Sequence, residues 1–187
     1  MRKTFLALLA LASGPALAAN PHVALQTSLG TITVELDAKR APLSTTNFLK
    51  YVDQHLFDGT SFYRVAKSAP GYGFIQGGIR GSGQRTLPPV AHEPTSKTGI
   101  HHVAGTISMA RQEPGTAEGD FFITTGKMPG MDAHGKDPGF AAFGHVTKGM
   151  NVVLKILNAV TLKGGQGAMA DQILKQRIAI LTAKRVP

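Results

Sequence analysis

The chain contains no cysteine and no tryptophan, and it has only three tyrosines. Without cysteine it has no thiol nucleophile, no disulfide and no lipid-modified cysteine of the bacterial lipoprotein kind. Its stability must therefore come from an apolar core alone. The sequence also lacks the patterns GxSxG, GxxxxGK[ST] and HExxH. Their absence excludes the common serine-hydrolase, P-loop and zinc-protease sites.

Long apolar runs are also missing, apart from one near the start of the chain. Arg2 and Lys3 precede the apolar run 5–12, and small residues follow it. This order is typical of a secretory signal peptide, and the run is shorter than the roughly 20 residues that a membrane helix needs. We therefore predict a signal peptide over 1–18, a single domain over 19–187, export from the cytoplasm and no membrane insertion.

Acidic residues are few relative to basic ones. The chain has 20 Lys and Arg against 11 Asp and Glu, and its net charge of +9 falls to +7 once Arg2 and Lys3 are removed. The basic residues are scattered, and no basic run with interleaved aromatics occurs. The pattern favours a solvated basic surface and no nucleic-acid partner. Binding to an anionic surface or to nucleic acid is an alternative that rests on the charge alone.

Histidines are the residues that invite a metal hypothesis. They include His92, the adjacent pair His101 and His102, His134 and His145. Adjacent residues on a strand point to opposite faces, so His101 and His102 are expected to be poorly placed to share an ion. We predict no metal site and no cofactor.

Short apolar segments separated by Gly and Pro dominate the chain after the leader. We expect strands at 23–27, 31–36, 61–65, 73–76, 105–109, 121–125, 140–146 and 177–183. Helical spacing predicts one helix that starts at Pro42 and a second over 149–160. Strands at this density favour a closed barrel or a sandwich over a parallel α/β sheet.

Eight short motifs occur in a characteristic order along the chain. They are VxLxTSxGxIxxEL, APxxxxNF, FYRV, IQGG, GTISMAR, DFFIT, FAAFGHV and KGMNVV. In this order they resemble the cyclophilin family of peptidyl-prolyl cis-trans isomerases, over nearly the whole predicted mature chain. The resemblance implies a mainly β fold, a closed eight-stranded antiparallel barrel capped by two α-helices.

The activity that the resemblance implies needs no nucleophile, in agreement with the absence of nucleophile motifs from the sequence. Amide resonance opposes rotation of a peptide bond by roughly 18–20 kcal/mol, and unaided X-Pro isomerisation is slow. Rotation breaks no covalent bond, so the site has only to favour the twisted amide over both planar forms. The resemblance implies a monomeric periplasmic enzyme that acts on proline-containing unfolded or partly folded polypeptides. An alternative is a chaperone or adaptor module that binds proline segments with little catalysis.

The resemblance also assigns roles to particular residues. It implies that Arg64 donates hydrogen bonds near the prolyl nitrogen, that Gln76 binds the substrate backbone and that Phe122 lies under the proline ring. Arginine suits this role because it stays charged and presents a fixed fork of donors. Taken alone, Phe122 would be a core aromatic and Arg64 a surface strand residue on the face of Phe62. The other implied substrate-binding residues are Phe74, Ala110, Arg111, Met131 and Phe140.

Three features depart from the family pattern. Arg64 and Gln76 are twelve positions apart, a longer separation than in common relatives, which places an insertion at 66–73. Asp120 stands where many relatives have glutamine, and it is expected either to pair with Arg64 or to repel acidic substrates. Gly130 takes the position associated with tight cyclosporin binding in some relatives. The departure at Gly130 predicts weak binding of that drug.

Overall fold

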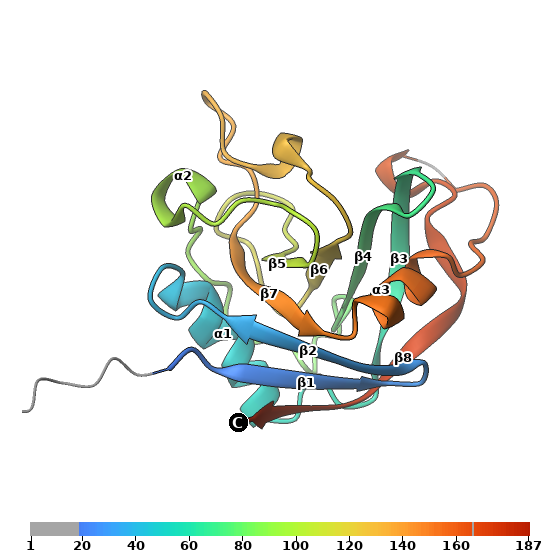
Figure 1. Ribbon diagram of the computed structural model, residues 1–187, viewed down its shortest axis with the longest axis horizontal. Helices are drawn as coiled ribbons and strands as arrows, with labels where there is room; N and C mark the ends of the chain where they lie inside the picture. Colours follow the sequence, from blue (N-terminus) through green and yellow to red (C-terminus); the bar gives the residue numbers. More distant parts are fainter. Residues whose placement is uncertain (1–18, 166) are drawn as a thin grey trace, which may run out of the picture.

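The computed structural model describes residues 19–165 and 167–187, so the signal peptide predicted over 1–18 lies outside the described residues. Eight antiparallel strands close into a barrel in the order β1-β2-β7-β5-β6-β4-β3-β8 (Figure 1). The strands are β1 (His22–Thr27), β2 (Gly30–Leu36), β3 (Thr60–Ala69), β4 (Tyr72–Gly78), β5 (Thr106–Met109), β6 (Phe121–Thr124), β7 (Ala142–Lys148) and β8 (Ile173–Val186). The predicted fold class is confirmed.

The helices are α1 (Pro42–Asp53), α2 (Thr95–Thr98) and α3 (Met150–Leu157), with 3₁₀ turns η1 (Pro129–Met131) and η2 (Gly167–Met169). The two predicted helices correspond to α1 and α3. Helix α2 was not predicted, because a single turn is too short to show helical periodicity. No helix in the described part of the chain is long and apolar enough to cross a membrane.

A distant carboxylate caps the N-terminus of α1. The side chain of Glu93 accepts hydrogen bonds from the backbone N–H groups of Leu43 and Ser44, at 3.0 and 2.7 Å. The Ser44 hydroxyl also donates to Glu93, at 2.7 Å. These contacts satisfy N–H groups that have no partner within the helix, and the negative charge suits the positive end of the helix dipole. They also tie α1 to the segment before α2.

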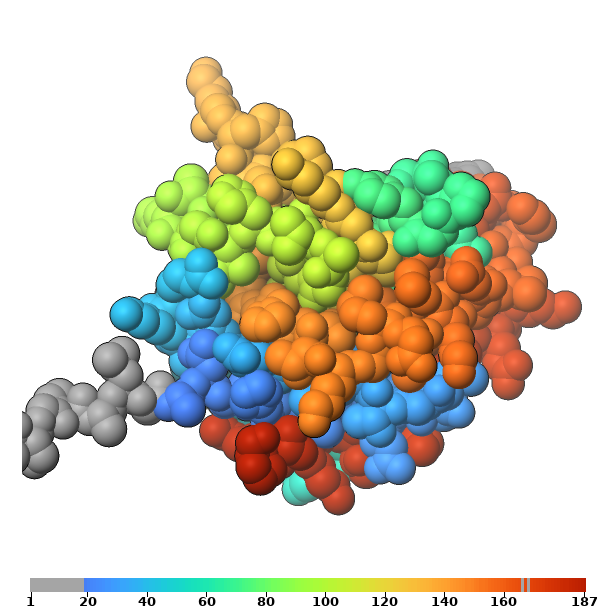
Figure 2. Space-filling view, in the orientation of Figure 1, coloured from blue at the N-terminus to red at the C-terminus, as the bar shows by residue number. Residues whose placement is uncertain are grey.

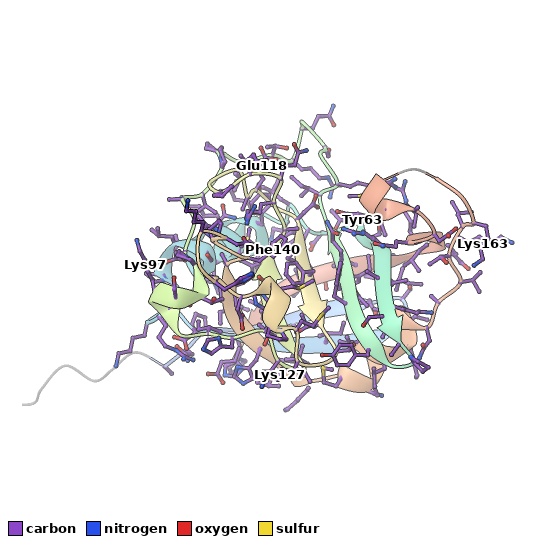
Figure 3. All side chains as sticks on the ribbon, turned by 90° about the horizontal axis from the view of Figure 1, so that it is seen from above. Tyr63, Lys97, Glu118, Lys127, Phe140 and Lys163 are labelled. Carbon is purple, nitrogen blue, oxygen red and sulfur yellow. The ribbon has the colours of Figure 1, made fainter. Side chains whose placement is uncertain are left out.

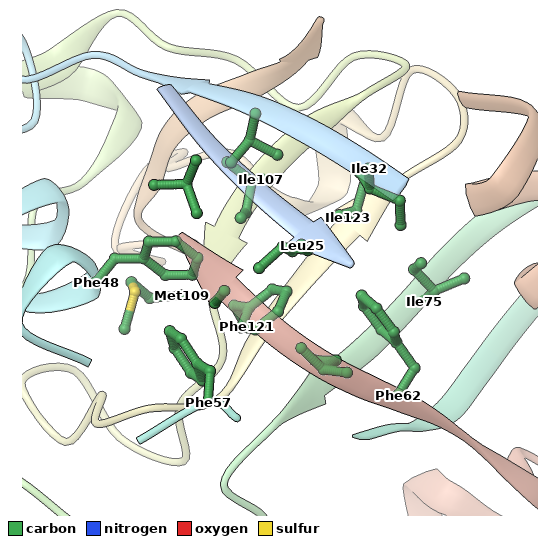
Figure 4. Close-up of a cluster of buried hydrophobic side chains, with 14 of the residues drawn as sticks. Leu25, Ile32, Phe48, Phe57, Phe62, Ile75, Ile107, Met109, Phe121 and Ile123 are labelled. Atoms are coloured by element: carbon green, nitrogen blue, oxygen red, sulfur yellow. The ribbon is translucent and has the colours of Figure 1, made fainter. Parts of the chain in front are cut away.

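The inside of the barrel holds one aromatic cluster (Figure 4). Phe121 is fully buried at its centre, and edge-to-face contacts join its ring to Phe48, Phe57 and Phe62 at centroid distances of 5.3, 5.5 and 5.7 Å. Such pairs stabilise a core beyond the area that they bury. This cluster connects α1 and the turn that follows it to β3 and β6 of the barrel.

The insertion predicted at 66–73 lies in the β3–β4 hairpin. Ala66 pairs with Phe74 and Ala69 pairs with Tyr72, so the ladder runs almost to the tip. Gly73 has a φ of +154°, and a Cβ there would lie 1.9 Å from the carbonyl oxygen of Ala66. Only glycine fits this close approach. Most of residues 66–73 therefore belong to the paired strands β3 and β4.

We expect Phe121→Ala to lower the free energy of unfolding by about 3–5 kcal/mol, because it opens a cavity among three fully buried rings. Urea-induced unfolding of the variant and the parent protein measures the difference. Phe140→Ala is the control, since Phe140 is only partly buried and lies outside the barrel, and it should cost far less. Equal losses for the two variants would contradict this account of the core.

Candidate active site

A row of side chains crosses the outer surface of four adjacent strands. Arg64 on β3 pairs with Gln76 on β4, Gln76 pairs with Phe122 on β6, and Phe122 pairs with Ser108 on β5. Directly paired residues lie on one face of a sheet, and neighbours along a strand lie on opposite faces. Because Phe121 points into the core, Phe122 points outward. The register therefore gathers residues that are far apart in the sequence.

Arg64 joins this row because β3 is irregular. Strict alternation puts Arg64 on the inner face with Phe62, but the register shifts between these two residues on both sides of β3. This β-bulge turns Arg64 to the outer face, and Phe62 stays in the core. The expectation that the two residues share a face is therefore wrong.

The row forms part of a pocket of about 470 Å³. All eight site residues inferred from the resemblance line it, namely Arg64, Phe74, Gln76, Ala110, Arg111, Phe122, Met131 and Phe140. The pocket is also lined by Tyr63, Gly81, Gln112, Thr116, Glu118, Asp120 and Met169. Figure 3 looks onto this face and shows Phe140 near its middle, with Tyr63 and Glu118 around it.

Aromatic rings form the apolar part of the pocket. The ring of Phe122, which is 3 % exposed, lies 5.4 Å from that of Phe74 and 5.4 Å from that of Phe140. The backbone N–H of Phe140 donates to the carbonyl oxygen of Met131 at 2.9 Å, which holds these two wall residues together. The result is a floor and walls suited to a small apolar ring.

Two amide side chains hold the Arg64 guanidinium. Its Nη1 donates to the Gln76 Oε1 at 2.9 Å, and its Nε donates to the Gln172 Oε1 at 2.8 Å. The guanidinium carbon lies 5.1 Å from the centroid of the Phe74 ring. Burial lowers the pKa of Arg64, but an arginine remains charged at neutral pH. Gln172 was not predicted as a site residue, because it lies 108 positions from Arg64 and belongs to none of the eight motifs.

Tyr63 and Asp120 fix the orientation of Gln76. The Gln76 Nε2 donates to the Tyr63 hydroxyl at 2.7 Å, and the backbone N–H of Arg80 donates to the Asp120 Oδ1 at 2.8 Å. The Tyr63 hydroxyl lies beside the Asp120 carboxylate, and burial together with that charge raises the pKa of Tyr63. Burial also raises the pKa of Asp120. Because the amide nitrogen of Gln76 donates to Tyr63, the amide oxygen of Gln76 points toward Arg64.

Arg111 and Ala110 form the opposite edge of the pocket. The Arg111 guanidinium lies over the Phe140 ring, 4.8 Å from its centroid, and donates to the carbonyl oxygen of Gly139. The backbone N–H of Ala110 donates to the carbonyl oxygen of Asp120 at 2.9 Å. The side chain of Arg111 thus supports Phe140, a contact that the sequence did not reveal.

The expectation that His101 and His102 lie on a strand is wrong. Their segment is not a strand, and both Nδ1 atoms contact Asp132, at 3.0 Å for His101 and 2.6 Å for His102. Over residues 19–165 and 167–187, no group of three metal-ligating side chains is arranged to hold an ion.

A closed eight-stranded barrel whose outer face carries an aromatic pocket and a fixed arginine has the features that the resemblance to the cyclophilin class of proline isomerases implies. The chain belongs to the family of cyclophilin-type peptidyl-prolyl cis-trans isomerases, whose model matches residues 22–185. It is 40% identical over 162 residues to peptidyl-prolyl cis-trans isomerase A of Dickeya dadantii, covering 84% of this chain and 82% of that protein.

Other comparisons agree with this membership. A peptidyl-prolyl cis-trans isomerase of Acinetobacter baylyi is 36% identical over 170 residues, covering 89% of this chain and 86% of that protein. The fold resembles a crystal structure of a Cryptosporidium parvum cyclophilin type peptidyl-prolyl cis-trans isomerase, with a TM-score of 0.70 and 22% identity. That likeness covers 90% of this chain and 98% of the other.

Replacing Asp120 should change stability in a pH-dependent way. Because the pKa of Asp120 is higher in the folded than in the unfolded state, ionisation of this carboxyl costs stability. We expect Asp120→Asn to be more stable than the parent protein at pH 7. The gain should shrink as the pH falls toward 3.8, the ordinary value for aspartate, because the parent carboxyl is then increasingly protonated. Urea unfolding across this pH range measures it.

Asp53→Asn is the matched control, for which the opposite change in stability is expected. Arg185 donates to Asp53 at 2.7 Å and lowers the pKa of Asp53. That variant should therefore lose stability at pH 7 and approach the parent protein as the pH falls below 3.8. A loss of stability at pH 7 in Asp120→Asn would contradict the burial argument.

Proposed function

We propose that this protein accelerates the cis-trans rotation of X-Pro bonds in polypeptides that fold after export, and that it works as a monomer in the periplasm. The observation that carries the activity is the row of Arg64, Gln76 and Phe122 in one pocket. The basic, apolar and small-residue order of the first 18 residues supports the place of action.

In this mechanism the apolar walls hold the proline ring. Phe122 forms the floor, with Phe74 and Phe140 at its sides. A ring held there stays still while the part of the chain before the proline turns about the amide bond. Edge-to-face contact of Phe140 with Phe122, at an interplanar angle of 89°, leaves a concave surface rather than a flat one.

Arg64 supplies the electrostatic part of catalysis. Hydrogen bonding to the prolyl nitrogen draws its lone pair out of conjugation with the carbonyl group, which lowers the barrier to rotation. This interaction is stronger in the twisted state, where the lone pair is localised, than in either planar state. Gln76 and Gln172 hold the guanidinium in place before the substrate arrives, so little reorganisation is needed.

The proposed substrates are proline-containing unfolded or partly folded chains. Slow X-Pro isomerisation limits the folding of many proteins, so such chains present the bond in an accessible form. The pocket lies at the surface and is lined by both acidic and basic side chains, Glu118, Asp120 and Arg111 among them. A solved structure with the same fold, 22% identical and with a TM-score of 0.71, is a Cryptosporidium parvum cyclophilin type isomerase determined in the presence of the dipeptide Ala-Pro.

Arg64→Ala tests the catalytic role. We expect kcat/KM for isomerisation of a proline peptide to fall by about 100- to 1,000-fold, the usual effect of removing one preorganised donor from a transition state. The fold should be retained, because Arg64 is only partly buried and lies outside the barrel core. NMR exchange spectroscopy on the peptide and proline-limited refolding of a client protein give independent rates.

Arg40→Ala is the control for the loss of a positive charge. Arg40 is exposed and pairs with Asp37, outside the pocket, so its removal should leave the rate unchanged. If the parent protein and Arg64→Ala both bind proline peptides without speeding their isomerisation, the protein is a binding module and the enzymatic proposal fails.

Weak binding of cyclosporin is a separate expectation. Gly130 is exposed beside the pocket residue Met131, and apart from its two chain neighbours no residue has a heavy atom within 4 Å of the position of an added Cβ. We expect a Kd above 1 µM, which is an interaction weaker than about 8 kcal/mol. Gly130→Trp, which adds an aromatic surface at this open position, should bind more tightly. Calorimetric titration of both proteins measures the difference, and submicromolar affinity of the parent protein would contradict the prediction.

A further inference from the structure

His102 lies directly behind the floor of the pocket. Its side chain is fully buried, and its ring is stacked on the Phe122 ring with an interplanar angle of 11° and a centroid distance of 5.7 Å. Phe122 thus has the open pocket on one side and an imidazole on the other. The orientation of the floor depends on where that imidazole is held.

Two polar contacts fix the His102 ring. Its Nδ1 lies 2.6 Å from the Asp132 Oδ1, and its Nε2 lies 3.0 Å from the Ser108 Oγ. The backbone N–H of His102 donates to the same Asp132 oxygen at 3.0 Å. Because a carboxylate can only accept, Nδ1 carries the proton, and Nε2 accepts from the serine hydroxyl in the neutral ring. Both nitrogens are satisfied, so the ring cannot flip without losing hydrogen bonds.

Asp132 connects His102 to a wall of the pocket. It directly follows Met131, whose carbonyl oxygen accepts from the N–H of Phe140 at 2.9 Å. On the same segment, the N–H of Met128 donates to the carbonyl oxygen of His102 at 2.8 Å. Figure 2 shows the segment after β6, yellow to orange, lying against the light green residues near 100. One buried histidine therefore contacts the floor directly and the wall through Asp132.

Ser108, His102 and Asp132 have the order of a hydrolase triad, but they cannot act as one. Ser108 and His102 are both fully buried, so no substrate reaches the serine hydroxyl. Ser108 is instead the last member of the outer-face row, directly opposite Phe122. Ser108, His102 and Asp132 thus connect the row of side chains on the outer face of the sheet to the pocket wall at Met131.

We propose that His102 is a positioning residue for isomerisation. Through its contacts with Ser108 and Asp132, it holds the Phe122 ring of the floor in a fixed position relative to the wall at Met131. The proposal rests on the proposed isomerase function. Nothing in the eight family motifs pointed to it, because His102 lies between motifs and touches no substrate.

The first test compares His102→Asn and Asp132→Ala with the parent protein. Asparagine can keep a donor near Asp132 but removes the ring that supports Phe122, and Asp132→Ala keeps the ring but releases the wall. We expect kcat/KM on an Ala-Pro-containing peptide to fall by about tenfold in each variant, mainly through KM, because the floor and the wall bind the proline ring and a displaced floor or wall binds it less well. Rates are measured at 10 °C on samples shown to be folded by circular dichroism.

The double variant separates positioning from mere stabilisation. If both residues act through one connection, the loss in the double variant is smaller than the product of the two single losses. His101→Ala is the matched control, because His101 also contacts Asp132, at 3.0 Å, but its side chain is 65% exposed and does not line the pocket. Its kinetic constants should match those of the parent protein. Unchanged KM in folded His102→Asn and Asp132→Ala, with only lower unfolding midpoints, would overturn the proposal.

A spectroscopic readout does not depend on activity or on folding of a variant. Nitrogen-15 NMR of the parent protein should show His102 as the neutral Nδ1–H tautomer at pH 7. Burial lowers the pKa of His102, the nearby His101 lowers it further, and the Asp132 carboxylate acts in the opposite direction. An Nε2–H tautomer or a cationic ring at pH 7 would overturn the proposal. If the parent protein shows the expected tautomer but does not speed isomerisation, the proposed isomerase function is wrong and the positioning role of His102 is not. In that case the positioning role is tested by titrating the same variants with the peptide and comparing their Kd values.

Discussion

Adjacent phenylalanines on β6 face opposite sides of one sheet, and both the core and the pocket depend on this alternation. Phe121 packs edge-to-face on three rings inside the barrel, while Phe122 forms the pocket floor on the outside. Because a strand cannot slip by one residue without exchanging these two faces, the stability of the core also fixes the register of the pocket. The site is thus as rigid as the strand that carries it.

The same strands place charge where the reaction needs it. Cross-strand pairing brings Arg64 beside Gln76, and the hydrogen bonds from Gln76 to Tyr63 and from Arg64 to Gln172 hold both side chains. A reaction that only rotates a bond needs such prearranged donors and a shaped apolar surface, and no nucleophile. The absence of cysteine and of nucleophile motifs is therefore in keeping with the chemistry of this site.

The amino-acid sequence predicted the regular elements well, since their signals are local. Alternation and turn residues indicated all eight strands, and helical spacing indicated α1 and α3. The eight site residues came from the family resemblance rather than from physical reasoning, because Phe122 taken alone reads as a core aromatic. Tyr63 and Gln172, which hold Gln76 and Arg64, were missed because nothing in the local pattern marks an ordinary polar residue as a partner.

By itself the sequence determined the succession of strands along the chain and the family, since these depend on period-two patterns and on short motifs. Only the tertiary structure decided which distant groups meet. The bulge that turns Arg64 outward, the cap that Glu93 places on α1 and the shared contact of His101 and His102 with Asp132 all depend on strand register and loop path. These contacts join residues from separate segments, and the free energy that selects them comes from packing the whole barrel rather than from any local preference.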